Sequence, residues 1–206
     1  MKKSSSGSTT DFKLLGAITT GALLLWGIFK VVETKMDTLT KIANFITKML
    51  PVAYDIEKKY GIKPIITLSQ SAHESDYGTG SIALKTNNIF SMTDYSGTWA
   101  KQGGKVFATP SREFLNNKWV TAPGVPFRVY NDWKASAVNW ADMLSQNKKW
   151  VNAYASAKLG NLPQYAVDII HPPTGEGYAT DPKYDIYLIS VGKTVQDYLD
   201  KLRMSV

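Results

Sequence analysis

The chain has 206 residues, of which 44% are hydrophobic and 20% charged, and it carries a formal net charge of +7. This length suits one ordinary domain with a short additional segment. The absence of cysteine excludes disulfides, cysteine nucleophiles and cysteine-ligated metals, and the two histidines argue against a histidine-rich metal site. The positive charge favours an anionic partner. Lysine greatly outnumbers arginine and no dense basic block occurs, so nucleic acid is not an expected partner.

An uncharged, mostly apolar run follows a polar, serine-rich tail at the start of the chain. Residues 1–12 are predicted to form a disordered tail and residues 13–32 a transmembrane anchor, because the stretch 14–32 approaches the roughly 20 residues needed to span a bilayer. A cleaved signal peptide and a buried core helix are the alternatives. The following Lys30-Val-Val-Glu33 is a poor cleavage site, and the run has no polar face. Lysines in the tail favour a cytoplasmic amino terminus, with the rest of the chain outside.

Helical periodicity dominates the remaining residues, 33–206, which we expect to form one domain. Proline and glycine mark its helix ends: Pro51 is expected to start a new turn, Gly61 to end a helix and Pro64 to begin the next. Asp181, followed by proline, is a typical start for the last helix. The predicted helices span residues 33–50, 53–60, 64–77, 81–86, 133–146, 149–158, 162–170 and 181–202.

The pattern changes between Ile89 and Val129. Turn signals at Gly103-Gly104 and Asn116-Asn117 are flanked by the strand-like pairs Val106-Phe107 and Trp119-Val120. These features predict a small β-hairpin. The fold class is therefore expected to be mainly α with a small β-hairpin lobe, preceded by one transmembrane helix.

A candidate acid lies in the predicted helix 64–77. Gln70, Glu74 and Tyr77 fall on one helical face at spacings of four and three, and Ile66 shares that face. A carboxyl in partly apolar surroundings has a raised pKa, and a glycosidase needs a carboxyl that is still protonated near neutral pH. The spacing alone fits equally an ordinary carboxylate on a helix surface.

Several separated motifs resemble the glucosaminidase domain of bacterial cell-wall hydrolases, glycoside hydrolase family 73. The likeness covers roughly residues 40–203, and the motifs occur in the family's order. They are Tyr60-Gly-Ile-Lys-Pro64, Leu68-Ser-Gln70, Glu74-Ser75, Asn87-Asn-Ile-Phe-Ser-Met92, Thr109 with Glu113-Phe114, Phe127-Arg-Val-Tyr130 and Tyr178-Ala-Thr-Asp-Pro-Lys-Tyr184.

The resemblance implies a lysozyme-like α+β fold and assigns roles to individual residues. Glu74 would be the general acid, Glu113 the second carboxylate, and Tyr178 a cleft residue that acts beside the acid. The residues that it implies contact or shape the substrate site are Gln70, Tyr77, Asn88, Phe90 and Tyr184. No metal or other cofactor is implied, because carboxyl groups suffice for glycoside hydrolysis.

The second carboxylate is the open point of this assignment. One extra residue separates Thr109 from Glu113 relative to the family pattern, so Asp94 and Asp76 are the alternatives. His73 stands where the family has a small apolar residue or leucine, and we expect it to pack or to contact substrate. The inverting, retaining or transglycosylase outcome depends on that second group.

The expected function is a peptidoglycan hydrolase that cleaves the glycan strand at the β-1,4 bond after N-acetylglucosamine. A lytic transglycosylase and a non-catalytic peptidoglycan-binding membrane tether are the alternatives. Residues 14–32 would anchor the protein in a lipid membrane as a single-pass protein, with the domain on the periplasmic or wall side, or in a viral membrane. Local wall remodelling or penetration by a trans-envelope or viral assembly fits such an anchor.

Overall fold

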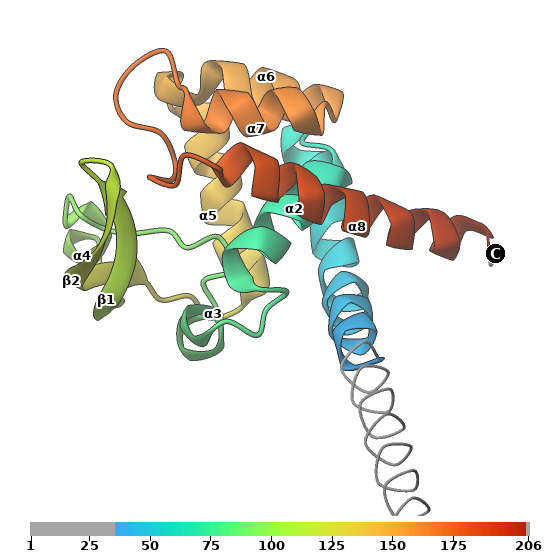
Figure 1. Cartoon of the computed structure of the whole chain (residues 1–206), viewed down its shortest axis with the longest axis horizontal. Coiled ribbons are helices and arrows are strands. Elements are labelled where there is room, and N and C mark those ends of the chain that lie inside the picture. The colour runs from blue at the N-terminus through green and yellow to red at the C-terminus, as the bar shows by residue number, and fades with distance from the viewer. Residues whose placement is uncertain (1–35, 205–206) are drawn as a thin grey trace, which may run out of the picture. The chain divides into compact units, whose positions relative to one another are not determined.

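The computed structural model describes residues 36–204 (Figure 1), so the predicted tail (1–12) and anchor (13–32) lie outside the described residues. Within residues 36–204, no helix combines the length and apolar character needed to cross a membrane. The chain divides after Lys41 into two units, and the fold described below belongs to the second.

A single helix runs through residues 42–60 without the break predicted at Pro51. A proline inside a helix removes one backbone hydrogen bond. Met49 and Ala53, on either side of it, are fully buried in the core, and packing of an apolar face outweighs such a local loss. The helix ends as predicted at Gly61, which has a φ of 73° and donates its N–H to the Glu57 carbonyl at 2.8 Å.

Helix α2 (Pro64–Ser75) is the buried centre of the domain and packs against α8 (Tyr184–Met204) and α7 (Leu162–Ile170). Figure 1 shows α8 crossing α2, with α7 beside it. The close approach of α8 requires Gly192, where an added Cβ would lie 1.9 Å from a Leu162 methyl group and 3.1 Å from Ser69 Oγ.

Helix α2 ends two residues earlier than the predicted Tyr77. Asp76 and Tyr77 both have left-handed backbones, with φ values of 49° and 54°. The Ser75 hydroxyl accepts the Gly78 N–H at 2.8 Å, which closes the chain into a tight turn. The face that links Gln70 and Glu74 therefore does not extend to Tyr77.

The other helices agree closely with the sequence prediction. The predicted ranges 81–86, 133–146 and 162–170 are confirmed, and Asp132 caps the second of them by accepting the Ala135 N–H at 2.7 Å. The four-residue α4 was not predicted. The remaining elements are α3 (Ser81–Thr86), α4 (Thr98–Lys101), α5 (Trp133–Gln146), η1 (Lys148–Trp150) and α6 (Val151–Leu159).

The predicted hairpin is formed by β1 (Val106–Leu115) and β2 (Lys118–Arg128), an antiparallel pair. Asn116 and Asn117 make the two-residue turn, both with positive φ, as the turns favoured in hairpins require. In Figure 1 the hairpin and α4 lie together to the left of the helices. The fold class is thus confirmed as mainly helical, with a small two-stranded sheet.

The turn after α2 provides a matched test of its packing against Trp133. Gly78→Ala places a Cβ 2.4 Å from Trp133 Cη2, whereas Gly97→Ala meets no atom within 4 Å. Both glycines have a φ near 70°, so each variant loses about 1–2 kcal/mol of unfolding free energy from the backbone. We expect Gly78→Ala to lose a further ~1–3 kcal/mol from overpacking. Urea unfolding of both variants measures the difference, and equal losses would contradict this packing.

Candidate active site

Glu74 lies in the last turn of α2, where its carboxyl meets the first residue of α8. The Tyr184 hydroxyl donates to Glu74 Oε1 at 2.6 Å. The Ser91 hydroxyl donates to the backbone oxygen of Glu74 at 3.2 Å, which fixes the neighbouring loop to this end of the helix. The acid is thus held by two segments that are remote from it in sequence.

Burial raises the pKa of Glu74 from 4.5 to about 7, while the hydrogen bond from Tyr184 and, after it, the nearby Ser91 hydroxyl lower it. The side chain keeps a partly exposed surface, yet protein atoms surround its carboxyl closely. Desolvation therefore outweighs both donors, because the charged form loses more hydration than two hydrogen bonds return. A substantial fraction of Glu74 is protonated at neutral pH.

Three tyrosines lie near enough to this carboxyl to feel its charge, and Tyr184 is the one that donates to it. Burial, and then the negative charge of Glu74, hold the pKa values of Tyr165, Tyr178 and Tyr184 well above the usual value. All three remain neutral hydroxyls and serve as hydrogen-bond donors, not as bases. The Tyr178 hydroxyl donates to the Phe90 carbonyl, so its predicted action beside the acid stays a prediction.

Gln70 is fully buried, and its predicted contact with substrate stays a prediction. Its Oε1 accepts hydrogen bonds from Trp140 Nε1, at 3.0 Å, and from the Tyr165 hydroxyl. Its Nε2 donates to the Tyr184 hydroxyl at 3.2 Å. Gln70 therefore contacts Glu74 only indirectly, through Tyr184. The family motif had placed Tyr184 in the site as a residue that contacts or shapes the substrate site.

Asn88 and Phe90 are also fully buried and shape the site without facing it. Asn88 Nδ2 donates to the carbonyls of Met92 and Arg128, at 2.8 and 3.0 Å, and its Oδ1 accepts the Met92 N–H at 2.9 Å. Phe90 stacks on Trp140, with ring centroids 4.4 Å apart. Their predicted part in the substrate site stays a prediction.

Tyr77 belongs to a different part of the molecule from the one predicted. Because α2 ends at Ser75, the Tyr77 ring packs edge-on against Phe45, with centroids 5.8 Å apart. Burial raises its pKa, and a hydrogen bond with Thr194 opposes that rise. The prediction that Tyr77 lies on the same helical face as Glu74 is therefore wrong.

Glu113 lies on β1 and is tied to the segment that leads into α8. Thr180 Oγ1 donates to Glu113 Oε2 at 2.7 Å and accepts the Phe114 N–H at 3.0 Å. This threonine, which the sequence analysis did not single out, fixes the hairpin carboxylate to the segment that carries Tyr178 and Tyr184. Glu113 remains partly exposed and can meet a ligand or a water molecule.

The two alternatives to Glu113 have other roles. Asp94 is buried and caps α4, accepting the N–H groups of Trp99 and Ala100 at 2.9 and 3.0 Å. Burial tends to raise the pKa of Asp94, but these backbone donors hold it below the usual value. Asp76 is exposed beyond the end of α2 and accepts the Thr79 hydroxyl at 3.1 Å. The choice of Glu113 as the second carboxylate stays a prediction.

His73 packs edge-on against Tyr184, with ring centroids 4.9 Å apart, as the packing prediction required. Burial lowers the pKa of His73, and the charge of Asp181 opposes that change. The imidazole is therefore neutral at neutral pH. Among residues 36–204, no group of three His, Cys, Asp or Glu side chains is arranged to hold a metal ion.

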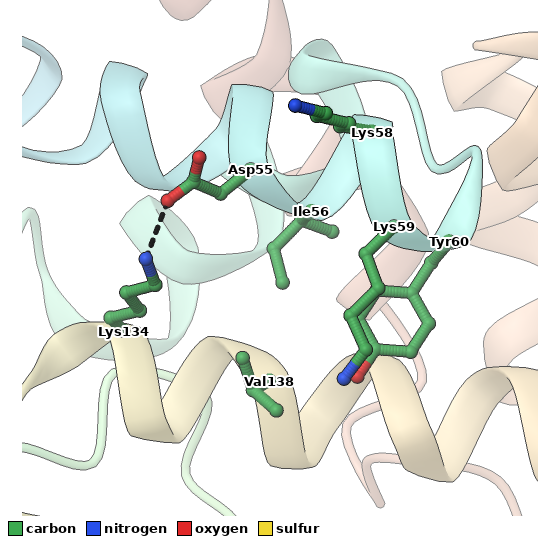
Figure 2. A pocket seen from close by; sticks show the side chains of 7 residues that line it. All are labelled: Asp55, Ile56, Lys58, Lys59, Tyr60, Lys134 and Val138. Carbon is green, nitrogen blue, oxygen red and sulfur yellow. Dashed lines mark hydrogen bonds and ion pairs between the residues drawn. The ribbon is translucent and has the colours of Figure 1, made fainter.

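A separate hollow of about 400 Å³ lies between helix 42–60 and α5, away from Glu74 (Figure 2). Figure 2 shows Asp55 paired with Lys134 at one end, at 2.6 Å. The Lys134 hydrogen bond lowers the pKa of Asp55, so this hollow offers no protonated carboxyl. Its lining residues are Asp55, Ile56, Lys58, Lys59, Tyr60, Lys134 and Val138.

The bond between Tyr184 and Glu74 predicts a measurable change in the acid. Tyr184→Phe removes a donor to the carboxylate, so the pKa of Glu74 should rise further above 7. Tyr187→Phe, on the same helix but exposed, is the matched control and should leave it unchanged. Titration of ¹³C-labelled glutamate carboxyls by NMR measures both, and an unchanged midpoint in Tyr184→Phe would contradict the assigned bond.

Comparison with known proteins places this chain in a family. Residues 50–197 match the Glucosaminidase family model, described as mannosyl-glycoprotein endo-β-N-acetylglucosaminidase. The chain is 30% identical over 142 residues to a probable N-acetylmuramidase of Lactococcus lactis subsp. cremoris, covering 68% of this chain and 30% of the relative. It is 29% identical over 157 residues to the peptidoglycan hydrolase FlgJ of Vibrio parahaemolyticus, covering 74% and 47%.

A third relative is the exo-glucosaminidase LytG of Bacillus subtilis, 27% identical over 143 residues, with 68% of this chain and 46% of the relative covered. The chain thus spans less than half the length of these three curated relatives.

Solved structures share the fold. A peptidoglycan hydrolase mutant from Sphingomonas sp. A1 superposes with a TM-score of 0.64 at 21% identity, covering 77% of this chain and 98% of that one. The glycoside hydrolase domain of Salmonella typhimurium FlgJ gives 0.57 at 22% identity, covering 80% and 94%. At such identities the likeness concerns the fold alone. Because the family model covers more than half of its residues, this chain belongs to the glucosaminidase family.

Proposed function

We propose that this protein hydrolyses the glycan strand of peptidoglycan, with Glu74 as the general acid. The observation that carries the proposal is the enclosed carboxyl whose pKa is raised to about 7. A departing sugar oxygen needs a proton, and glycosidases deliver it from a carboxyl that stays protonated near neutral pH. Family membership supports this reaction class, as do relatives named as a peptidoglycan hydrolase and an exo-glucosaminidase.

The bond proposed for cleavage is the β-1,4 linkage after N-acetylglucosamine. The family description names a β-N-acetylglucosaminidase, which favours that bond. The Lactococcus relatives are named probable N-acetylmuramidases, which would cut the alternate linkage of the same strand. The reducing end that cleavage releases distinguishes these two specificities.

Glu113 is proposed as the second carboxylate. It lies on the hairpin, is partly exposed and is oriented by Thr180, whereas Asp94 is engaged in capping α4. A carboxylate in this position can activate a water molecule or stabilise the positive charge that develops on the sugar. Without it, the acetamido oxygen of the substrate would have to assist, or the sugar's own 6-hydroxyl would attack. The second route is lytic transglycosylase chemistry.

A non-catalytic tether to peptidoglycan is the alternative from another functional class. Burial of a carboxyl opposes its ionisation and is unfavourable for folding at neutral pH. A protein that only binds the wall would not need such a group at the end of α2. The raised pKa of Glu74 therefore favours an enzyme over a tether.

We propose further that residues 14–32 anchor the enzyme in a membrane, with the amino terminus cytoplasmic and the domain on the wall side. The apolar run and the lysines of the tail support this. An anchored hydrolase reaches only nearby wall, which fits local remodelling or penetration by a trans-envelope or viral membrane assembly. Recovery of the full-length chain in the soluble fraction of fractionated cells would contradict the anchor.

The reaction is tested by digesting purified peptidoglycan with the full-length chain and identifying the released ends by mass spectrometry. Wild type should release new reducing N-acetylglucosamine ends. Glu74→Gln should slow release by about 10³-fold and Glu113→Gln by about 10²-fold, within the range for acid–base groups. Glu176→Gln, an exposed glutamate on a loop, is the matched control and should behave as wild type.

Each other product pattern has a definite meaning. Reducing N-acetylmuramic acid ends would replace the proposed specificity with that of a muramidase, and anhydro-muramyl ends would identify a transglycosylase. Retained binding with no cleavage by wild type would contradict an enzyme and leave the tether. Full activity of Glu113→Gln would remove Glu113 from the mechanism.

A further inference from the structure

A buried chain of hydrogen bonds leads from the core to the acid. Trp140 Nε1 and the Tyr165 hydroxyl donate to Gln70 Oε1, Gln70 Nε2 donates to the Tyr184 hydroxyl, and Tyr184 donates to Glu74 Oε1. Gln70 is completely buried, and the Tyr184 residue is only 4% exposed. These hydrogen bonds connect α5, α7, α2 and α8 where the four helices meet.

The direction of this chain follows from Trp140. An indole N–H can only donate, so the atom of Gln70 that faces it must be the carbonyl oxygen. The amide nitrogen must then face Tyr184, and its N–H groups can only donate. The Tyr184 oxygen accepts that hydrogen bond, so its own hydroxyl proton points to Glu74 Oε1, which lies 2.6 Å from the Tyr184 oxygen.

We infer that Gln70 is a positioning residue that fixes the direction of the Tyr184 hydroxyl and thereby confines the acid proton of Glu74 to Oε2. Oε1 accepts a hydrogen bond from Tyr184, and the carbonyl oxygen of a protonated carboxyl is a stronger acceptor than its hydroxyl oxygen. The protonated acid is therefore more stable with its proton on Oε2 and Oε1 as the carbonyl oxygen. The catalytic meaning of this arrangement rests on the proposed function, whereas the position of the proton does not.

The arrangement suits the proposed reaction. As the glycosidic carbon–oxygen bond breaks, its electron pair goes to the departing oxygen, which takes the proton from Oε2. Glu74 becomes a carboxylate, and the Tyr184 hydroxyl stabilises the new charge at Oε1 without having to turn. Gln70 thus preorganises a donor that is needed only after the proton has left.

The other titratable side chains around Glu74 do not titrate in its place near pH 7. Burial keeps Tyr165 on α7, Tyr178 before α8 and Tyr184 on α8 neutral, with pKa values well above the usual value. His73, which packs on Tyr184, has a lowered pKa because it is buried. Glu74 is the group of this set that titrates near pH 7.

Two buried substitutions separate positioning from packing. Gln70→Met removes the N–H that holds Tyr184, so the Tyr184 oxygen can accept a proton from neutral Glu74. The pKa of Glu74 should then rise by roughly 0.5 to 1, the effect of one hydrogen bond. Tyr165→Phe disturbs the same buried cluster but leaves Trp140 to orient Gln70, so the pKa of Glu74 should not change.

Both variants are titrated as the full-length chain by NMR of ¹³C-labelled glutamate carboxyls, with urea unfolding to record their stability. The alkaline limb of the rate of peptidoglycan cleavage should move with the NMR midpoint in Gln70→Met alone. A wild type that cleaves no peptidoglycan would contradict the proposed function. The NMR titration would still test the position of the proton in that case.

A second measurement needs only the wild type and covers the case of a variant that does not fold. Ionisation of Glu74 polarises Tyr184, which in turn polarises the Gln70 amide. The side-chain amide resonances of Gln70 should therefore titrate with the midpoint of Glu74, and those of exposed Gln164, on α7, should not.

The inference is overturned if the pKa of Glu74 is unchanged in Gln70→Met, or if Gln70→Met and Tyr165→Phe raise it equally. In the second case the rise follows general loosening of the core. A Gln70 amide that does not follow the titration of Glu74 in the wild type would also overturn it.

Discussion

The enclosure of the Glu74 carboxyl is the constraint on which the rest of this structure depends. Raising its pKa from 4.5 to about 7 corresponds to about 3 kcal/mol in favour of the neutral form. Because the folded pKa lies above the unfolded one, this stabilisation is complete below about pH 4.5 and is lost as the pH rises to about 7. The fold must therefore compensate elsewhere for holding an acid that the proposed function requires.

The central position of α2 explains how that compensation is arranged. Small polar residues let other helices approach α2 closely, and Ser71 and Ser75 satisfy their own hydroxyls by donating to carbonyls one turn earlier, at 2.6 and 2.5 Å. Gly192 lets α8 approach Ser69. The approach of α8 brings Tyr184 to Glu74. The close packing of α8 on α2 therefore also places the hydrogen-bond donor of the acid.

Local signals in the sequence predicted much of the fold. Gly61 and the Asn116-Asn117 turn act within a few residues of themselves, and the helix end and the hairpin turn that they mark were found as predicted. Helix α4 was missed because it depends on Asp94, whose carboxylate is buried only in the folded domain. The break predicted at Pro51 was wrong because burial on both sides of it outweighs the local cost.

The candidate site was predictable as a set of residues but not as a network. The family motifs proposed Glu74, Glu113, Tyr178 and Tyr184 as candidates, yet the bond between Glu74 and Tyr184 joins residues 110 positions apart. Gln70 occurs in a motif, but the motif does not reveal that its side chain is completely buried and hydrogen-bonded to Tyr184. Sequence spacing reports which residues share a helix face, not which of them remain exposed after helices pack.

The pH dependence of kcat/KM for peptidoglycan cleavage tests most directly whether Glu74 acts as a protonated acid. The alkaline limb should have a midpoint near 7, because Glu74 loses the proton it must donate as the pH rises through its pKa. That midpoint should coincide with the NMR titration of the Glu74 carboxyl in the same protein. A rate that stays constant well above the NMR midpoint would show that cleavage proceeds with Glu74 ionised, and would contradict its role as the acid.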